Sequence, residues 1–344
     1  MRQSERLQTF VQLGTFLRSP EAQPELEQVA RRAFQLNPWF TTTNTLTALR
    51  AIATRYLDAD MLNQWASRYR AEPPAPKQVG VVMAGNIPAV GFHDMLCVLV
   101  SGHHLLGKLS SQDFVLIQYL IQKITEINPA FTEFITVAER LNAADAYIAT
   151  GSDNTARYFH HYFGKKPNII RRNRTSIGIL MGEEQDDELV KLGQDMLLYY
   201  GLGCRNVSTL LIPDDYRPET LMRALEPLAP EYIHQNKYVN NYDYNKSIYL
   251  VNQVPHFDNG FLLMTQNDTL VSPISVIYYQ VYRNLEEADA FIRKHAETIQ
   301  VVASAARRHS EGWYPGSVAF GQTQQPGLFD YADGVDTMAF LATL

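Results

Sequence analysis

The 344-residue sequence has few cysteines, few charged residues and no long uninterrupted apolar run. Two cysteines, Cys97 and Cys204, are too few for a disulfide framework, which favours a reducing, cytoplasmic setting. The most apolar window, residues 79–102, is interrupted by Asn86 and Pro88, so we expect no membrane span there. The start of the chain lacks the apolar segment of an export signal.

The charge balance excludes further classes of partner. Thirty basic residues stand against 36 acidic ones, a net charge of −6 that offers no broad basic surface to nucleic acid or anionic lipid. No H-E-x-x-H or C-x-x-C pattern accompanies the nine histidines, so we expect no metal site. With 46% apolar residues the chain has the composition of a globular protein with a large core.

The length corresponds to roughly two domains of about 150 residues. Apolar residues recur at helical spacing up to about residue 70, and the proline-rich stretch 72–76 then ends this helical lead-in. The expected segments are a helical lead-in, a dinucleotide-binding domain, a catalytic thiol domain and a C-terminal segment that packs back on the dinucleotide-binding domain. Their predicted bounds are 1–72, 73–175, 176–316 and 317–344.

Short apolar runs alternate with helical patterns after the linker, which predicts parallel strands joined by right-handed helical crossovers. The expected product is an α/β protein with two doubly wound sheets. The expected strands are 79–83, 105–109, 134–137, 146–149, 168–170, 177–180, 207–212, 261–264, 276–281 and 299–303. A helix is expected over 285–298, Ser110 and Asp113 mark the start of another, and Ser152 is placed to cap a third.

Cys204 is the candidate nucleophile. It lies in Gly201-Leu-Gly203-Cys204-Arg205, between a helical pattern and a strand, where glycines let a substrate approach the backbone and a cation favours the thiolate. A structural cysteine beside a helix-ending glycine fits the spacing equally well. Cys97, within an apolar run, is predicted to be core.

Two turns at strand ends are candidate ligand sites. Asn86 follows the first strand, where open α/β sheets bind ligands, although a turn asparagine explains it too. Residues 150–153 form a similar corner, where the start of a helix attracts phosphate. The glycine-rich dinucleotide fingerprint is absent. The basic run 171–174 is typical of a solvated loop.

Taken in order, four motifs resemble the landmarks of the aldehyde dehydrogenase superfamily: Asn86-Ile-Pro88, Gly107-Lys108-Leu-Ser-Ser, Thr150-Gly-Ser-Asp153 and Gly201-Leu-Gly-Cys204. Within it, the chain is most similar to acyl-CoA reductases of the type that supplies fatty aldehyde in bacterial luminescence, and residues 320–340 add to the likeness. The resemblance covers about residues 75 to 344.

The resemblance implies an aldehyde dehydrogenase-like fold with a Rossmann-variant cofactor domain that does without the glycine fingerprint. It implies that Cys204 accepts the acyl group and that Asn86, with the Cys204 backbone N–H, stabilises the oxyanion. It also implies NADPH or NADH as cofactor, CoA as part of the substrate and a homodimer. Four residues would hold the nicotinamide dinucleotide: Lys108, Thr150, Gly151 and Ser152.

The departures from the family pattern indicate which reaction to expect. Residues 171–174 stand where hydrolytic members carry a water-activating glutamate, and residues 269–273 stand where many members have a ribose-binding glutamate. Oxidation of aldehyde to acid needs activated water, whereas a reductase needs only CoA as leaving group. We therefore expect reduction of acyl-CoA to aldehyde. Aldehyde oxidation, acyl-phosphate reduction and a non-catalytic binding scaffold are the alternatives, and the acyl chain length stays open.

Overall fold

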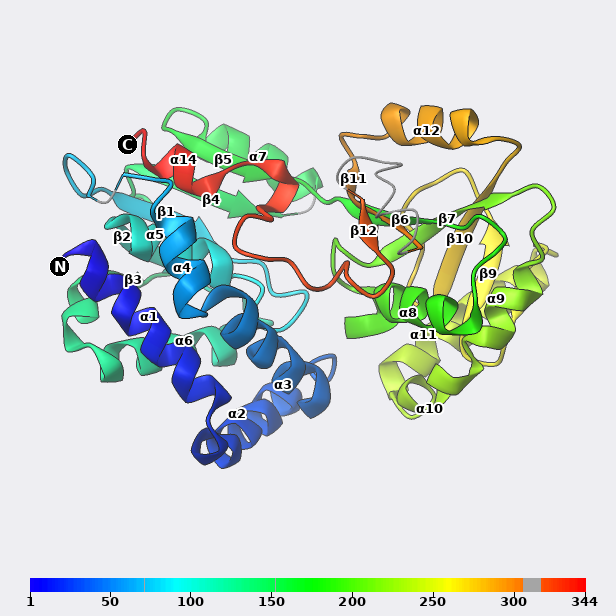
Figure 1. Cartoon of the computed structure of the whole chain (residues 1–344), viewed down its shortest axis with the longest axis horizontal. Coiled ribbons are helices and arrows are strands. Elements are labelled where there is room, and N and C mark those ends of the chain that lie inside the picture. Colours follow the sequence, from blue (N-terminus) through cyan, green and yellow to red (C-terminus); the bar gives the residue numbers. More distant parts are fainter. Residues whose placement is uncertain (71, 152, 306–316) are drawn as a thin grey trace. The chain divides into compact units, whose positions relative to one another are not determined.

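The structure is a computed structural model that describes four stretches of the chain: 1–70, 72–151, 153–305 and 317–344. These residues form two compact units (Figure 1). The first unit joins Met1–Asn173 to the C-terminal stretch Gln325–Leu344, and the second unit is Arg174–Gln324. None of the helices in the described stretches is long and apolar enough to cross a membrane.

The first unit is built on a five-stranded sheet in the order β3-β2-β1-β4-β5, in which every neighbouring pair is parallel. Parallel neighbours need crossovers, and the helices α5, α6 and α7 provide them. The chain leaves β1 in one direction along the sheet and continues from β4 in the other, so a switch point lies between these strands. The elements are β1 (Gln78–Val82), α5 (Phe92–Ser101), β2 (His104–Lys108), α6 (Phe114–Ile127), β3 (Ile135–Val137), β4 (Ala146–Thr150), α7 (Asp153–Phe163) and β5 (Asn168–Arg171).

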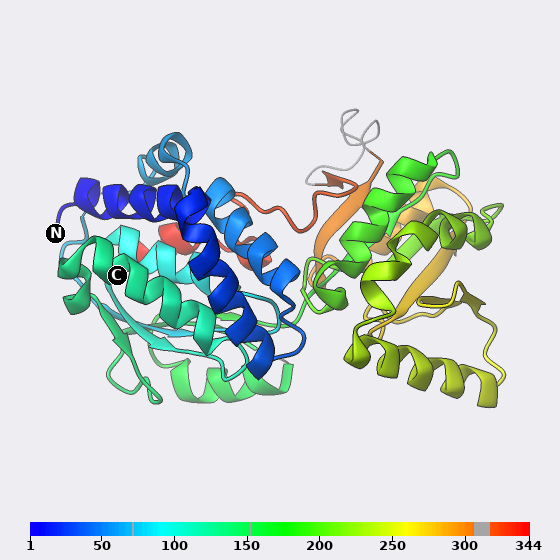
Figure 2. The ribbon, with the colours of Figure 1, turned by 90° about the horizontal axis from the view of Figure 1, so that it is seen from below.

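The helical lead-in packs on this unit. Helix α1 contacts α5 and α6, and α2 contacts α6. Figure 2 shows these helices over α6, with α7 on the opposite side of the sheet. The lead-in comprises α1 (Gln3–Arg18), α2 (Gln23–Leu36), α3 (Thr42–Ala51), a π-helical turn (Ile52–Tyr56) and α4 (Ala59–Ala66).

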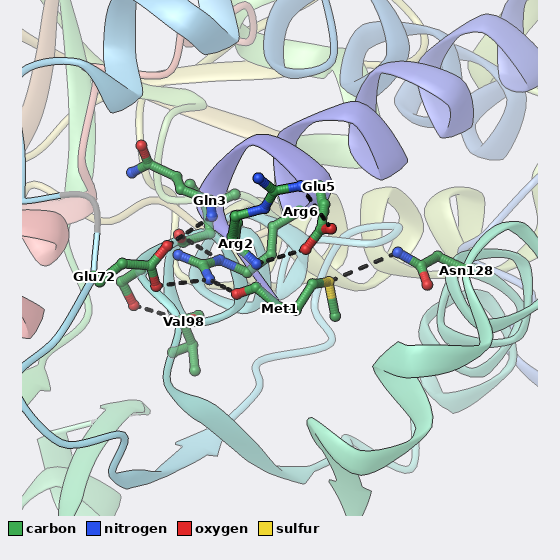
Figure 3. Close-up of polar contacts among 10 residues, drawn as sticks. Met1, Arg2, Gln3, Glu5, Arg6, Glu72, Val98 and Asn128 are labelled. Carbon is green, nitrogen blue, oxygen red and sulfur yellow. Dashed lines mark hydrogen bonds and ion pairs between the residues drawn. The ribbon is translucent and has the colours of Figure 1, made fainter.

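A buried arginine fastens α1 to the unit (Figure 3). Arg6 is only 1% exposed. Its guanidinium donates to the Val100 carbonyl at 3.2 Å and to Glu72 Oε2 at 3.1 Å. Glu72 also accepts the Gln3 backbone N–H at 2.8 Å. The carboxylate at the start of the linker therefore compensates the buried charge and fixes the start of α1.

The C-terminal stretch returns to the first unit and ends in α14 (Thr337–Leu341). The Tyr331 hydroxyl accepts the indole N–H of Trp65 at 2.7 Å, and the Tyr69 hydroxyl donates to Asp336 at 2.7 Å. These bonds join the chain's end to the helical lead-in.

The second unit is a seven-stranded sheet in the order β12-β11-β6-β7-β10-β9-β8. Only the β8–β9 pair is antiparallel among the described strands. Helix α12 lies on one side of this sheet and α8 to α11 on the other (Figure 1). The strands are β6 (Thr175–Ile179), β7 (Val207–Pro213), β8 (Phe257–Asp258), β9 (Leu263–Gln266), β10 (Val276–Tyr282), β11 (Ile299–Ser304) and β12 (Val318–Ala319). The helices are α8 (Asp186–Leu197), α9 (Pro218–Ala224), α10 (Ala229–Tyr232), α11 (Asn236–Val251) and α12 (Leu285–Lys294).

Two local predictions were right in part. The helix expected over 285–298 begins at Leu285 but ends at Lys294, because the His295 N–H closes the last turn and the Thr298 N–H then bonds the His295 carbonyl. Helix α6 begins directly after Ser110–Asp113, as predicted, but its N-cap residue Asp113 makes no capping hydrogen bond with its side chain. Ser152, the other expected cap, lies outside the described residues.

Candidate functional site

The loop after β1 places Asn86 at the carboxyl edge of the first unit's sheet. β1 and β2 run parallel with Val82 opposite Lys108, and the Met83 N–H donates to the Lys108 carbonyl at 3.0 Å. The loop leaves the sheet next to the β1–β4 switch point, where open α/β sheets bind ligands. The Asn86 residue is exposed there.

Steric contacts at Gly85 and the left-handed conformation of Ala89 restrict the backbone of this loop. A Cβ added at Gly85 would lie 2.4 Å from Ser110 Oγ, so only glycine fits against the connection between β2 and α6. Ala89 adopts φ 54°, the left-handed region, which costs a non-glycine residue about 1 kcal/mol. We name residues 83–89 the Asn86 loop.

The other predicted cofactor residues lie at the same edge. β2 ends at Lys108 and β4 ends at Thr150, and these strands flank β1. Two strand spacings separate them by about 10 Å. Lys108 is exposed, and a Cβ at Gly151 would lie 2.9 Å from Thr155 Cγ2. Ser152 lies outside the described residues, so the structure brings together Asn86, Lys108, Thr150 and Gly151 without testing their roles.

This edge fits a dinucleotide. An exposed ammonium is available at Lys108, and the turn at Gly151 is followed by α7, whose N-terminal end favours phosphate. The close approach of Thr155 and Phe159 at Gly151 excludes larger side chains, so the turn packs tightly against these side chains. Within the stretches that the structure describes, no group of three or more His, Cys, Asp or Glu side chains is arranged to hold a metal ion.

Arg171 is buried, which corrects the prediction of a solvated basic run at its first residue, whereas Arg172 and Asn173 are exposed as predicted. Arg171 is 2% exposed and lies in β5 beside Thr150. Its guanidinium contacts Asp94 Oδ2 at 2.6 Å and Thr337 Oγ1 at 2.8 Å. Burial opposes the charge, but the Asp94 carboxylate outweighs it and leaves the pKa of Arg171 raised. The residue joins the sheet edge to α5 and α14 and offers no exposed cation to phosphate.

Cys204 lies in the second unit, in the connection between α8 and β7, and it is exposed. The Ser176 hydroxyl donates to the Cys204 carbonyl at 3.1 Å. Tyr199, Tyr200 and Gly201 adopt φ 54°, 59° and 75°, three successive left-handed residues that turn the chain out of α8. Two of them are tyrosines, so this turn stores backbone strain of about 1 kcal/mol or more per residue. Cys97, in contrast, is fully buried, as predicted, and burial raises its pKa well above the usual value.

Asn206 fastens the strained turn, and sequence reasoning missed this role. Its side chain is buried, and its Oδ1 accepts the Gly203 N–H at 2.8 Å. Its Nδ2 donates to two carbonyls near the end of α8, Asp195 at 3.0 Å and Met196 at 3.2 Å, and to that of Leu198, just after the helix, at 2.8 Å. One amide thus satisfies the helix end and the turn that presents the thiol. An asparagine two residues after a cysteine that follows two glycines was the available signal. We name residues 198–206 the Cys204 loop.

Asp195, near the end of α8, extends this support. Its buried carboxylate accepts the Gly321 N–H at 2.7 Å, the Thr323 N–H at 3.0 Å and the Thr323 hydroxyl at 2.8 Å. Burial raises the pKa of Asp195 to about 6, and these hydrogen bonds offset part of the rise. The carboxylate ties the last residues of the second unit to the helix that leads into the Cys204 loop.

Residues 269–273, where a ribose-binding glutamate was missing, are fastened to β7. The Leu270 carbonyl accepts hydroxyl hydrogen bonds from Ser208 and from Thr209, the latter at 2.8 Å. The N–H and hydroxyl of Thr269 both donate to Asn267 Oδ1 at 2.9 Å. The family pattern has a glutamate carboxylate in this segment. Here the segment has the Thr269 hydroxyl instead, and that hydroxyl already donates to Asn267 within the same turn.

The sequence matches no protein-family model and no curated protein. Solved structures do match. A structure of an NADP-dependent enzyme from E. coli aligns with TM-score 0.69 and 12% identity, over 95% of this chain and 79% of that one. Aldehyde dehydrogenase 21 from Physcomitrella patens aligns with TM-score 0.68 and 12% identity, over 94% and 79%.

An acetylating aldehyde dehydrogenase from Geobacillus thermoglucosidasius aligns with TM-score 0.62 and 12% identity, over 95% of this chain and 86% of that one. At such identities the likeness establishes the fold. The chain has an aldehyde dehydrogenase-like α/β fold with a helical N-terminal region, as predicted.

Proposed function

We propose that the protein reduces acyl-CoA to aldehyde through a thioester on Cys204. The observation that carries the proposal is an exposed thiol on a strained turn that a buried amide fastens at four backbone positions. Such a built support is what a nucleophile needs and what an incidental surface cysteine lacks. One structural neighbour is an acetylating aldehyde dehydrogenase, which supports the same chemistry.

In the first half-reaction, the Cys204 thiolate attacks the acyl carbonyl, the new C–S bond forms, and the bond to CoA breaks. The proposal assigns the oxyanion to the Asn86 amide and the Cys204 backbone N–H, each donor contributing about 3 kcal/mol. Arg171 bears on how the acyl group leaves the enzyme. It stands in the segment that replaces the water-activating glutamate, and a guanidinium that is buried against Asp94 cannot act as a base. Release of the acyl group by hydrolysis is therefore not favoured.

For the second half-reaction, we assign Lys108, Thr150, Gly151 and Ser152 to a nicotinamide dinucleotide. When bound, this cofactor supplies the reducing equivalents that convert the thioester to aldehyde. NADPH is our first choice over NADH, a fatty acyl chain our first choice of substrate, and a homodimer the proposed assembly. All three rest on the resemblance noted in the sequence.

The test follows CoA release and cofactor absorbance when the protein meets acyl-CoA and NADPH or NADH. We expect CoA release and an acyl adduct on the Cys204 peptide by mass spectrometry, both abolished in Cys204→Ala. Cys97→Ala serves as the control, because its buried thiol should not be acylated. Absence of the adduct in the wild type would favour a non-catalytic scaffold. Activity on aldehyde and oxidised cofactor without any use of CoA would favour an aldehyde-oxidising enzyme.

A further inference from the structure

A buried carboxyl lies beneath the Asn86 loop and has no place in the reaction above. Asp113 is the N-cap residue of α6 and is 3% exposed. An N-cap aspartate ordinarily accepts a backbone N–H from the first turn of its helix, but Asp113 makes no such bond. Its side chain is therefore directed to something other than starting the helix.

The Asn86 loop is what this side chain meets. The Asp113 Cβ lies 3.1 Å from the Cβ position of Gly85. The backbone N–H of Ala89 acts on its carboxyl, although neither carboxyl oxygen has a partner of full hydrogen-bond geometry among the described residues. Ala89 is the residue held in the left-handed conformation. Asp113 thus contacts both ends of the segment that presents Asn86.

The charge state of this carboxyl follows from its surroundings. Burial raises its pKa well above the ordinary value, and the Ala89 N–H opposes the rise. Burial and this N–H are the only influences on it from the residues that the structure describes, so no charged or titratable side chain of β1, β2, α6 or the Asn86 loop compensates an ionised form. A buried carboxylate without a cation is strongly disfavoured, so the neutral acid is the form that suits the packed loop.

We propose that Asp113, as a neutral acid, is the positioning residue that holds the Asn86 loop in the shape in which Asn86 serves the acyl transfer. A neutral carboxyl needs no cation in this buried place, and its oxygen can still accept from the Ala89 N–H. Loss of its proton leaves an uncompensated buried charge beneath the loop. The loop must then open to hydrate that charge, and Asn86 leaves its working position. This inference rests on the proposed function.

The kinetic test measures the rate of CoA release in a single turnover across pH. The wild-type rate of CoA release should decrease as the pH rises into the alkaline range, which gives the pH profile an alkaline limb. Asp113→Asn, which imitates the neutral acid, should acylate within about threefold of the wild type and lack that limb. Asp113→Ala should be slower by about a hundredfold at every pH, because misplacing a catalytic donor by about 1 Å has an effect of that size. An unchanged limb in D113N, or full speed in D113A, would overturn the proposal.

A second measurement separates this inference from the proposed reaction. Hydrogen exchange of the peptide spanning residues 84–92, without substrate, should accelerate in the wild type as the pH rises, beyond the intrinsic pH effect, and should not do so in D113N. The peptide spanning residues 198–206 is the control and should show no difference between the two proteins. If the wild type releases no CoA, the proposed function fails, yet the exchange result still decides whether Asp113 holds the loop. If D113A does not fold, D113N alone gives both answers.

Discussion

The Asn86 loop and the Cys204 loop both contain left-handed residues, Ala89 in the first and Tyr199 and Tyr200 in the second, but buried side chains of different character support them. Asn206 holds the Cys204 loop with one accepted and three donated hydrogen bonds. Asp113 lies under the Asn86 loop without a fully formed hydrogen bond to any described residue. An amide has no proton to lose near neutral pH, whereas a carboxyl does.

The difference indicates a division of tasks between the units. The loop with the thiol is fixed by an amide whose contacts do not depend on pH. The loop with the proposed oxyanion donor depends on the protonation of one acid. Around the Cys204 loop, the acid that does titrate, Asp195, acts from the helix behind it and not on the turn itself.

Replacing Asn206 by alanine should have the largest effect on stability. The change leaves the Gly203 N–H and three helix-end carbonyls unsatisfied in a buried place, so we expect a loss of about 3 to 5 kcal/mol in the free energy of unfolding. Urea denaturation followed by circular dichroism measures it. Asn63→Ala is the matched control, because Asn63 is exposed and makes one bond to the Ala59 carbonyl, at 2.8 Å. Equal losses in the two variants would contradict the assigned role of Asn206.

Asp195 should make the free energy of unfolding of the second unit depend on pH. Its pKa is raised from 3.8 to about 6 in the folded protein, so folding takes up a proton in this range. The stabilisation by the protonated form is complete below pH 3.8 and is lost as the pH rises through 6. The loss from this group amounts to about 3 kcal/mol.

Urea denaturation at pH 4, 5, 6 and 7 measures this effect as a difference between proteins. Asp195→Asn should flatten the wild-type dependence between pH 4 and 6. Its hydrogen bonds to Gly321 and Thr323 would be partly kept by the amide oxygen, so the variant should still fold. Identical pH dependence in both proteins would show that Asp195 keeps an ordinary pKa.

Much of the fold was predictable because buried parallel strands are continuous apolar runs, and each of the first unit's five strands lies within a residue or so of its expected place. Strands β8 and β12 have two residues each, too few to show a period. The burial of Arg171 was missed because its partners lie 77 and 166 residues away in sequence. A run of charged residues predicts a solvated loop, because the sequence does not show the distant partners that allow one of these charges to be buried.

Site residues were predictable from the sequence where neighbouring residues determine their setting. They were not predictable where contacts with residues distant in the sequence determine it. Glycines around Cys204 and the asparagine after a strand were visible in the sequence, and both residues are exposed in the structure. Asp113 read as an ordinary helix cap, since only the fold shows that its carboxyl faces the Asn86 loop instead. Asp195 gave no signal because its partners begin 126 residues later.

Gly85→Ala should distort the Asn86 loop. The added methyl would lie 2.4 Å from Ser110 Oγ, so the loop or the connection after β2 must shift, at about 1 to 3 kcal/mol of unfolding free energy. Gly107→Ala is the control, because its methyl would have no neighbour nearer than 3.5 Å. The second-site change Ser110→Gly should restore most of the stability lost in G85A. Failure of that rescue would show that the contact with Ser110 does not limit the loop.

The smallest effect is expected where the chemistry is proposed to occur. Cys204→Ala should change the free energy of unfolding by less than about 0.5 kcal/mol, because the side chain is exposed and buries little apolar surface. Cys97→Ala should lose about 1 to 2 kcal/mol, since its fully buried sulfur leaves a small cavity. Alkylation by iodoacetamide should follow the same contrast, rapid at Cys204 and negligible at Cys97 until the protein unfolds, because the buried thiol is inaccessible and its pKa is raised. Stability that depends strongly on Cys204 would indicate a structural cysteine, and the Cys204 loop would then be a device of folding and not of catalysis.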